Sequence, residues 1–584
     1  MFFIIKRHLQ SQRYFFISFF NNSIIFFLIN VYSDMSQYTL KYLKNTEVNI
    51  NNVLIITGDF NIRDSLWAAW ALFSKEEFRQ ALVKCNNSSV PGPDKLMWRY
   101  LKIILNQDSC LSHIINIVDA CIKLGHWPNH FKHLSMIIIS KLNKPAYDSP
   151  KSFCPIVLLN TIGKLIEKVI AEHLQFHVVK NNFIHPSQLG SLKFKSTTNV
   201  GIMLTHIIWS GWIKNKTTGT LAFDTAQFFP SLNHCILILS LAKAGLDPKV
   251  TSFFKDFLVK RRTNYTWNEF SSPTFEVNVG VGQGSALSPI LSVLYLSLLL
   301  YILEKHLKTL NIPISFLSFV NHGLLISQNK SIDVLNSQLF YSYNVLSGLL
   351  DKFGLNIEHS KTESFHFNRS HGIFNPPPLD LLPLGESILQ PKNSCKYLGF
   401  IFDQKLTFHQ HINFYSNKAI STSKCMKLLE NSTQEINPLQ KWLLYKCCVL
   451  PIVLYGFQLW FYNKASFSYP MKILGKMQRK AAIWILGVFK MSLIEGLEAI
   501  TGLIPIKSYL YKLTGRSQLC SASLPENYLI KNLMDDPLNT HLNSHPHSIN
   551  SLTVRQKTSI KGHIIDSNNK LYGVFPSFSP LNPE

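Results

Sequence analysis

The chain has 584 residues, 46% of them hydrophobic, which is enough to bury several large cores and excludes a wholly disordered protein. Lys and Arg number 58 against 34 Asp and Glu, so the formal charge is +24 although only 16% of the residues are charged. This excess favours a polyanionic partner, either a nucleic acid or an acidic membrane face, and argues against a cationic substrate.

The ten cysteines form no C-x-x-C pair and have no regular spacing, so neither a disulfide scaffold nor a zinc ribbon is expected. Three histidines near the end of the chain, His541, His545 and His547, have no cysteine or acidic residue at ligand spacing. We therefore expect a polar loop there and assign no zinc.

The first thirty residues are rich in Phe and Ile, but the apolar stretch 15–29 is interrupted by Asn21 and Asn22 and is too short to span a bilayer cleanly. No small-residue cleavage site follows, which argues against a secretory signal. The β-branched and aromatic run 24–31 predicts a buried strand instead. We expect no membrane partner and no secretion.

A second apolar strand, 53–57, is followed at once by Gly-Asp-Phe-Asn-Ile-Arg, which delivers Asp59 and Asn61 into the next loop. Catalytic groups often lie at the carboxyl ends of strands, although an Asx turn explains the same residues. The string resembles the GDFN-x-R segment of endonuclease/exonuclease/phosphatase-type nucleases carried by non-LTR retrotransposons. The resemblance implies that Asp59 and Asn61 orient the attacking water and the scissile phosphate.

The other ligands of that nuclease family are missing, and a metal-assisted hydrolase needs a complete carboxylate set and a base. We therefore expect residues 1–67 to be a truncated, vestigial endonuclease fragment of α/β type. Residues 68–90 then form a junction to the next region.

From residue 91 a second pattern begins with Pro-Gly-Pro-Asp and continues with an apolar strand at 137–141. Ser-Phe-Cys-Pro-Ile at 152–156 and an amphipathic helix over 158–170 follow. These segments resemble the fingers of non-LTR retrotransposon reverse transcriptases. Cys154 stands where that family has an Arg, and a thiol cannot make the bidentate contact of a guanidinium, so the grip on substrate or template is expected to be weakened.

The short apolar strand 221–224 ends in Asp224, which on its own would most simply cap the following helix. With its neighbours it resembles motif A of reverse transcriptases, which implies that Asp224 is the first Mg²⁺ ligand. Phe229 matches the position whose bulky ring selects deoxynucleotides.

Gly-Val-Gly-Gln-Gly-Ser at 280–285, followed by Ser-Pro and a long apolar helix over 290–303, predicts a loop whose backbone can approach a ligand closely. A turn before a helix is the structural alternative. The string closely resembles motif B of the same family, which implies that Gln283 and Gly284 lie near the incoming nucleotide and the template base.

Motif C departs from the family. The strand 314–319 runs into Val-Asn-His-Gly, where the family pattern is F-x-D-D. Asn321 and His322 thus replace both aspartates, and no acidic residue lies between Asn311 and Gln328. Mg²⁺ prefers charged oxygen ligands, so we expect that the two-metal site of nucleotidyl transfer does not assemble.

Gly-Leu-Asn-Ile-Glu-His-Ser-Lys at 354–361 resembles motif D, which implies that Lys361 protonates the pyrophosphate leaving group; alone it would be a solvated lysine. Tyr-Leu-Gly-Phe at 397–400 resembles the hairpin that supports the primer end. Residues 396–490 carry thirteen Lys or Arg against three acidic residues, with tryptophans between them. This composition indicates either a solvated helical face or the thumb that tracks a nucleic-acid backbone, and we favour the thumb.

The sequence therefore predicts an α+β right-hand polymerase fold with helical fingers, an antiparallel-sheet palm and a helical thumb. Fingers and palm are expected over 91–375, the palm hairpin and thumb over 376–510, and a loop-rich tail over 511–584.

By family the function is RNA-directed DNA polymerisation, with an RNA template, a DNA primer and deoxynucleotide triphosphates as partners and Mg²⁺ as cofactor. Because both motif C aspartates are absent, we expect this copy to be inactive. A non-catalytic nucleic-acid-binding protein and a decayed element remnant are the alternatives. The sequence leaves the oligomeric state open, and a nuclear or cytoplasmic location is expected if the protein is made.

Overall fold

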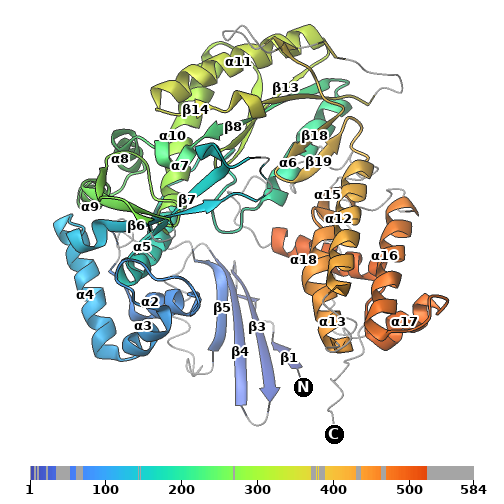
Figure 1. Ribbon diagram of the computed structural model, residues 1–584, viewed down its shortest axis with the longest axis horizontal. Coiled ribbons are helices and arrows are strands. Elements are labelled where there is room, and N and C mark those ends of the chain that lie inside the picture. The colour runs from blue at the N-terminus through green and yellow to red at the C-terminus, as the bar shows by residue number, and fades with distance from the viewer. Residues whose placement is uncertain are drawn as a thin grey trace.

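The computed structural model describes residues 70, 72–142, 144, 146–267, 270–369, 376–377, 379–380, 388–428, 436–461 and 468–522, together with strands within residues 2–60. It combines helices and sheets, with a central sheet, a second sheet beside it and a helical C-terminal region (Figure 1).

The central sheet is antiparallel and has the strand order β12-β13-β8-β14, with β15 also paired to β8. Its strands are β8 (Thr217–Ala226), β12 (Ile314–Phe319), β13 (His322–Asn329), β14 (Asn356–Ile357) and β15 (Glu363–Phe367). The predicted strands at 221–224 and 314–319 are confirmed.

Both faces of the central sheet are covered, which explains the nearly continuous burial along β8. Leu221 and Leu325 join a core that includes the long helix α10 (Ser288–Thr309) and α11 (Ile332–Lys352). Ala222 and Leu324 belong to a second core on the C-terminal side. The sheet is therefore held between two hydrophobic layers.

Helices before and after β8 pack into the first core, except that the buried residues of α6 belong to the second core. They are α2 (Lys75–Val83), α3 (Trp98–Leu105), α4 (Asp108–Leu124), α5 (Thr161–Lys180), α6 (Thr197–Ile213), α7 (Phe228–Ser231), α8 (His234–Lys243) and α9 (Pro248–Leu258), with 3₁₀ turns η3 (Asn129–Lys132) and η4 (Pro150–Ser152). The helix expected from residue 158 begins at Thr161, because residue 158 still belongs to a strand.

A second sheet, called here the side sheet, lies among these helices. It has the order β10-β9-β6-β7, with β11 paired to β9, and mixes parallel with antiparallel pairs. Its strands are β6 (His133–Ser140), β7 (Phe153–Leu158), β9 (Arg261–Trp267), β10 (Phe270–Ser271) and β11 (Phe275–Val277). The strand predicted at 137–141 is confirmed as part of β6, and the region expected to be helical contains a whole sheet, because the apolar run at 133–140 pairs with strands on both sides.

The C-terminal part of the chain consists of two short hairpins followed by helices that pack around the second core. The hairpins are β16 (Leu379–Asp380) with β17 (Ile388–Leu389), and β18 (Ser394–Tyr397) with β19 (Phe400–Asp403). The helical elements are α12 (His409–Lys427), α13 (Pro438–Leu444), the π-turn η6 (Tyr445–Val449), α14 (Leu450–Val453), α15 (Phe457–Trp460), α16 (Ser468–Leu486), α17 (Ile494–Thr501) and α18 (Ile506–Ala522).

The predicted loop-rich tail is wrong for its first residues, because α18 continues through Ala522 and packs on α15 and α16. Buried Leu510 and Thr514 anchor this helix, although the sequence there has little periodicity. The rest of the predicted tail, with its three histidines, lies outside the described residues.

The first sixty residues contribute β1 (Phe2–Ile5), β2 (His8–Leu9), β3 (Gln12–Asn21), β4 (Ile24–Ser33) and β5 (Val53–Phe60). The strands predicted at 24–31 and 53–57 are confirmed, and β4 pairs with β5 in parallel. Asp59 lies inside β5, so its expected place in the following loop is wrong, because the strand runs on to Phe60. Asn61 lies outside the described residues.

Of the described helices, α10 alone is long and apolar enough to cross a membrane by length and composition. In this structure 72% of its most apolar stretch is buried inside the protein, where it forms the centre of the first core.

Two carboxylates on α5 differ sharply in environment and give a test of the packing. Glu167 is fully buried and accepts hydrogen bonds from Ser285 Oγ and the Ala286 N–H, the latter at 3.2 Å. It also offsets the charge of buried Arg261. Glu172 lies on the surface, 2.9 Å from Lys84.

We predict that Glu167→Ala lowers the free energy of unfolding by about 3–5 kcal/mol, because it leaves a buried cation and two donors uncompensated. Glu172→Ala on the same helix is expected to cost less than about 1 kcal/mol. Urea denaturation of the two variants measures both. Equal losses would contradict the assigned role of Glu167.

Candidate active site

Asp224 sits near the carboxyl end of β8, directly opposite His322 in the register of β13. The hairpin between β12 and β13 turns through Val320 and Asn321, because Phe319 pairs with His322. The Thr225 N–H donates to the carbonyl oxygen of Asn321 at 3.0 Å, which fixes the turn against β8. Motifs A and C are therefore side by side, as their resemblance to reverse transcriptases implies.

The turn itself is strained. Val320 has a φ of 55°, a left-handed conformation that is rare for a β-branched residue. The side chain of Gln188 stabilises it, since its Oε1 accepts from the N–H of Val320 at 3.2 Å and its Nε2 donates to Ser318 Oγ at 3.1 Å. Such outliers persist where surrounding structure fixes them and are concentrated at functional sites.

The Asp224 carboxylate is only 12% exposed and is surrounded by donors of the chain itself. Lys361 Nζ lies 2.7 Å from Oδ2, and Asn321 Nδ2 lies 2.5 Å from Oδ1. His322 Nδ1 lies 3.3 Å from the same Oδ1. The structure thus brings together all four residues that the sequence predicts for the catalytic centre. We call them the Asp224 cluster.

The Asp224 cluster does not fit two Mg²⁺ ions. Each ion prefers several oxygen ligands, charged where possible, and here a single carboxylate has both oxygens taken up by nitrogen donors. The Lys361 ammonium occupies the position of a countercation and would repel an incoming cation. Among the residues that the structure describes, no group of three or more His, Cys, Asp or Glu side chains could hold a metal ion. The role of Asp224 as a metal ligand stays a prediction.

A second acidic residue, Glu358, was not identified from the sequence, and its backbone is bonded to β8 at this point. The backbone N–H of Glu358 donates to the carbonyl oxygen of Asp224 at 2.8 Å. Its own carboxylate accepts from Ser360 Oγ at 2.9 Å. Only the folded chain brings Glu358 to this place, because it is separated from Asp224 by more than a hundred residues.

Gly280 and Gly284 permit the motif B loop to lie against its neighbours. A Cβ on Gly280 would approach the carbonyl oxygen of Pro230 to 2.3 Å, and one on Gly284 would approach that of Val157 to 2.5 Å. Both glycines also have positive φ, at 78° and 124°. The loop is thus pressed onto α7 and β7, where side chains other than hydrogen would not fit.

This packing brings Gln283 to the residue that replaces the family arginine. The Val157 N–H donates to the carbonyl oxygen of Gln283 at 2.8 Å, and Cys154 Sγ lies 3.5 Å from Gln283 Oε1. Both side chains are at least partly accessible, so the pair lines a surface. The structure places the two residues next to each other, while their contact with a nucleotide stays a prediction.

Glu167 was not identified from the sequence, although it supports the motif B loop through hydrogen bonds from Ser285 and Ala286. Burial raises the pKa of the Glu167 carboxyl, whereas the hydrogen bond from Ser285 and the charge of Arg261 act in the opposite direction. A Glu in an otherwise apolar helix face was the available signal, but its partners lie about a hundred residues away in the sequence.

Phe229 links motif A to motif B, and Tyr397 contacts the Asp224 cluster. The carbonyl oxygen of half-buried Phe229 accepts from the Val281 N–H at 2.8 Å, so its backbone joins the two motifs. The hydroxyl of buried Tyr397, in the β18–β19 hairpin, donates to the carbonyl oxygen of His322 at 3.4 Å. Burial raises the pKa of this phenol, which keeps it neutral.

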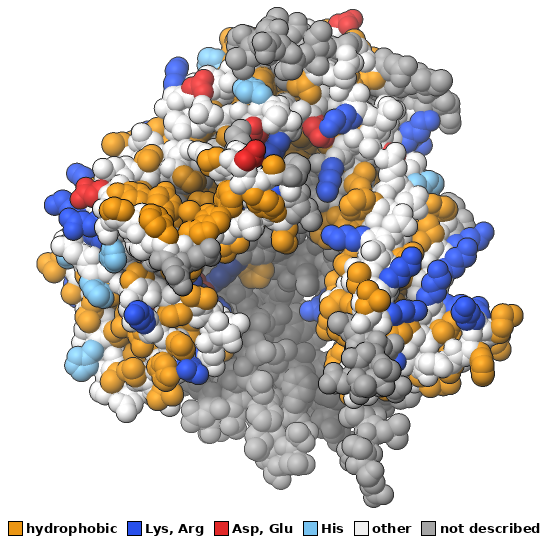
Figure 2. All heavy atoms as spheres, viewed as in Figure 1, with side chains coloured by type: hydrophobic (Ala, Val, Ile, Leu, Met, Phe, Trp, Pro, Cys, Tyr) orange, Lys and Arg blue, Asp and Glu red, His pale blue; other side chains and the backbone are white. Residues whose placement is uncertain are grey.

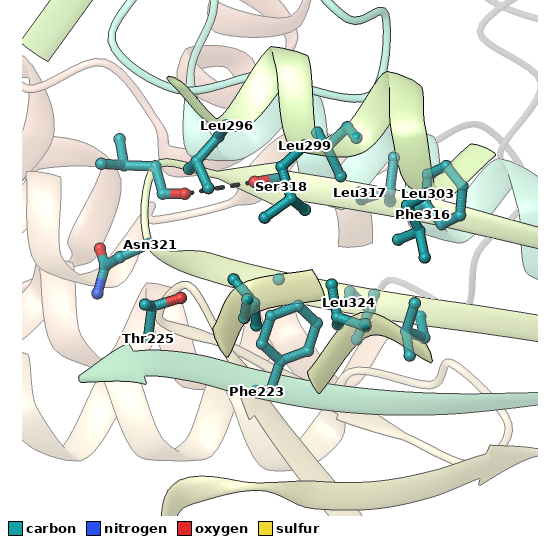
Figure 3. A pocket seen from close by; sticks show the side chains of 16 residues that line it. Phe223, Thr225, Leu296, Leu299, Leu303, Phe316, Leu317, Ser318, Asn321 and Leu324 are labelled. Carbon is teal, nitrogen blue, oxygen red and sulfur yellow. Dashed lines mark hydrogen bonds between the residues drawn. The ribbon is translucent and has the colours of Figure 1, made fainter. Parts of the chain in front are cut away.

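A small apolar cavity of about 30 Å³ lies behind the turn, between α10, α11 and the sheet. Figure 3 shows Leu296, Leu299 and Leu303 along one side of it, with Asn321 and Thr225 at one end. The apolar side chains that line this cavity pack against one side of the β12–β13 hairpin. The polar groups of the Asp224 cluster are therefore accessible from the other side only.

Residues 141–402 match the sequence model of the family described as "Reverse transcriptase (RNA-dependent DNA polymerase)". The chain is 25% identical over 390 residues to a probable RNA-directed DNA polymerase from transposon BS of Drosophila melanogaster, covering 66% of this chain and 42% of that protein. It is 24% identical over 418 residues to the RNA-directed DNA polymerase from mobile element jockey of Drosophila funebris, covering 69% and 43%.

Solved structures also resemble it, among them telomerase from Candida albicans in complex with a fragment of telomeric RNA. That match has a TM-score of 0.37 and 11% identity over 76% of this chain and 66% of the telomerase chain. The curated relatives are more than twice as long as the segment they share with this chain. Residues 141–402 thus match the reverse transcriptase family and are similar in sequence to the polymerases of non-LTR retrotransposons.

Proposed function

We propose that this chain binds nucleic acid through its reverse transcriptase domain and does not polymerise. The observation that carries the proposal is the Asp224 cluster, in which the chain's own Lys361, Asn321 and His322 satisfy the one carboxylate of the site. Nucleotidyl transfer by this family generally uses Mg²⁺, and a site with one carboxylate already paired to an ammonium gives Mg²⁺ no adequate ligand set.

In this proposal the side sheet with α3–α5 serves as the fingers and the central sheet as the palm, together spanning residues 91–375. The β18–β19 hairpin and the C-terminal helices, residues 376–510, serve as the primer support and thumb. Phe229, Gln283 and Gly284 would face the nucleotide and template. Residues 1–67 are proposed as a truncated nuclease fragment, with Asp59 and Asn61 as its vestigial site residues and no nicking activity.

Nucleic-acid binding is supported by the charge of the C-terminal region. Of the residues described between 396 and 490, twelve are Lys or Arg and one, Asp403, is acidic. Lys and Arg side chains gather there over the helices labelled α12 and α16 (Figures 1 and 2). A polyanion that runs along these helices would gain affinity by releasing its counterions. RNA template and DNA primer are the polyanions that the family resemblance suggests.

The first prediction concerns catalysis. The purified full chain is expected to extend no primer on an RNA template in Mg²⁺ or Mn²⁺, whereas the double variant Asn321→Asp/His322→Asp is expected to extend it. Primer extension resolved on a denaturing gel measures both. The matched control is the same double variant with Asp224→Asn, which removes the remaining carboxylate.

Extension by the unaltered chain would contradict the proposal. Measuring primer extension by the variant Glu358→Gln would then test whether Glu358 supplies the missing carboxylate. Its backbone N–H is bonded to the carbonyl oxygen of Asp224. If the double variant melts normally but extends nothing, adding Cys154→Arg tests whether the lost guanidinium also limits the reaction.

A second prediction concerns metal binding without reference to activity. In the double variant, aspartates at 321 and 322 face Asp224 at about 3–4 Å, where like charges repel by about 1–4 kcal/mol. We expect it to melt below the unaltered chain in EDTA and to regain stability in Mg²⁺. The unaltered chain should melt alike in MgCl₂ and in NaCl of equal ionic strength. A Mg²⁺-specific rise in its melting temperature would show that the site already holds the ion.

A third prediction separates local binding from total charge. The triple variant Lys472→Ala/Lys476→Ala/Lys480→Ala removes three exposed cations from α16. It should weaken RNA binding and reduce, by about 1–3, the steepness of the salt slope, which is the slope of log affinity against log salt concentration. The triple variant Lys243→Ala/Lys249→Ala/Lys255→Ala makes the same charge change on α8 and α9, far from α16 in Figure 1, and should have little effect. Fluorescence anisotropy over a series of salt concentrations measures both. Equal losses would mean that only net charge matters.

A further inference from the structure

The side sheet carries an aromatic cluster on the face turned away from Cys154. Adjacent residues of a strand point to opposite faces, so Phe153 lies on the other side of β7 from Cys154 and Gln283. The rings of Phe153 and Trp267 are 5.1 Å apart, and those of Phe153 and Tyr147 are 6.0 Å apart. We call these three residues the aromatic platform.

The aromatic platform is accessible. Trp267 is 41% exposed and Tyr147 is 47% exposed, and both line an open groove of about 600 Å³ between β6, β7 and β9. Phe270 beside it is 66% exposed. Hydrophobic side chains gather in Figure 2 over the area where Figure 1 labels β6 and β7. A contiguous patch of this kind marks an interaction site, whereas scattered apolar residues do not.

Positive charge borders the aromatic platform. Lys141 and Lys144 are exposed in the loop that also carries Tyr147, whose hydroxyl donates to the carbonyl oxygen of Lys141 at 2.7 Å. Lys260 and Arg262 are exposed at the start of β9. The acidic residues described nearby are Asp148 and Glu276, and Glu276 lies 3.7 Å from Arg262. Cations around open aromatic faces match a ligand with phosphates and flat bases.

We propose that the aromatic platform binds the unpaired bases of single-stranded nucleic acid, with the phosphates near Lys141 and Lys144. Every base has a π-face, so stacking on such rings tolerates any sequence. A purely apolar partner surface would gain nothing from the surrounding cations, whereas a single strand uses both features. This inference rests on the proposed function, since it names the form of nucleic acid that one part of the domain holds, away from the Asp224 cluster.

The test uses the full chain and two labelled probes, a single-stranded RNA and the same RNA paired to DNA. Tyr147→Ala/Trp267→Ala is expected to bind the single strand about tenfold more weakly and the duplex unchanged. The salt slope should stay the same, because no phosphate contact is removed. Trp267→Phe keeps a ring and should retain most of the affinity. Tyr341→Ala on α11, 41% exposed like Trp267, is the matched control and should change nothing.

The outcomes distinguish the two proposals. If the unaltered chain binds neither probe, the proposed function fails. If it binds both and the double variant binds the single strand equally well, the aromatic platform is refuted while the proposed function stands. If sedimentation shows instead that the unaltered chain self-associates and the double variant does not, the groove is an interface between copies, which also overturns the platform. Unchanged melting temperatures confirm that each variant is folded.

Discussion

The arrangement of the candidate active site depends on one buried carboxylate and the charge that balances it. Asp224 is held at the end of β8 between two hydrophobic cores, where an unpaired anion would be costly. Lys361 supplies the opposite charge, and Asn321 and His322 lie within reach of the same oxygen. Because these partners come from the hairpin and from the turn after β14, the ion pair also ties three separate segments of the chain together.

The scaffold around this pair is held together by contacts within the chain. The motif B loop packs on β7 and has glycines at the positions where a Cβ would collide with neighbouring backbone. The buried carboxylate of Glu167 accepts a hydrogen bond from the end of this loop. The strained turn at Val320 is still supported by Gln188. None of these contacts depends on a metal ion, so the fold can persist while the chemistry of the site changes.

Local patterns predicted part of this from the sequence, since the strand at 314–319 and the long helix after motif B followed from short-range signals. The grouping of Asp224 with Asn321, His322 and Lys361 in one site was implied only by the resemblance to reverse transcriptases. Partners distant in sequence could not be predicted, because burial of Glu167 beside Arg261 and the bond of Glu358 to Asp224 exist only after folding. The helix through residue 522 was missed because tertiary packing on α15 and α16, rather than periodicity, stabilises it.

The loss of the motif C aspartates has a physical consequence beyond catalysis. Carboxylates at 321 and 322 would face Asp224 with only Lys361 to balance them, and such repulsion lowers stability unless a metal is bound. Neutral Asn321 converts that repulsion into a hydrogen bond, and His322 adds no negative charge. Active-site residues commonly lower the stability of the folded protein in return for function. Replacing them therefore raises that stability. A site of this composition is stable without a metal ion, which is the property that the proposed loss of nucleotidyl transfer requires.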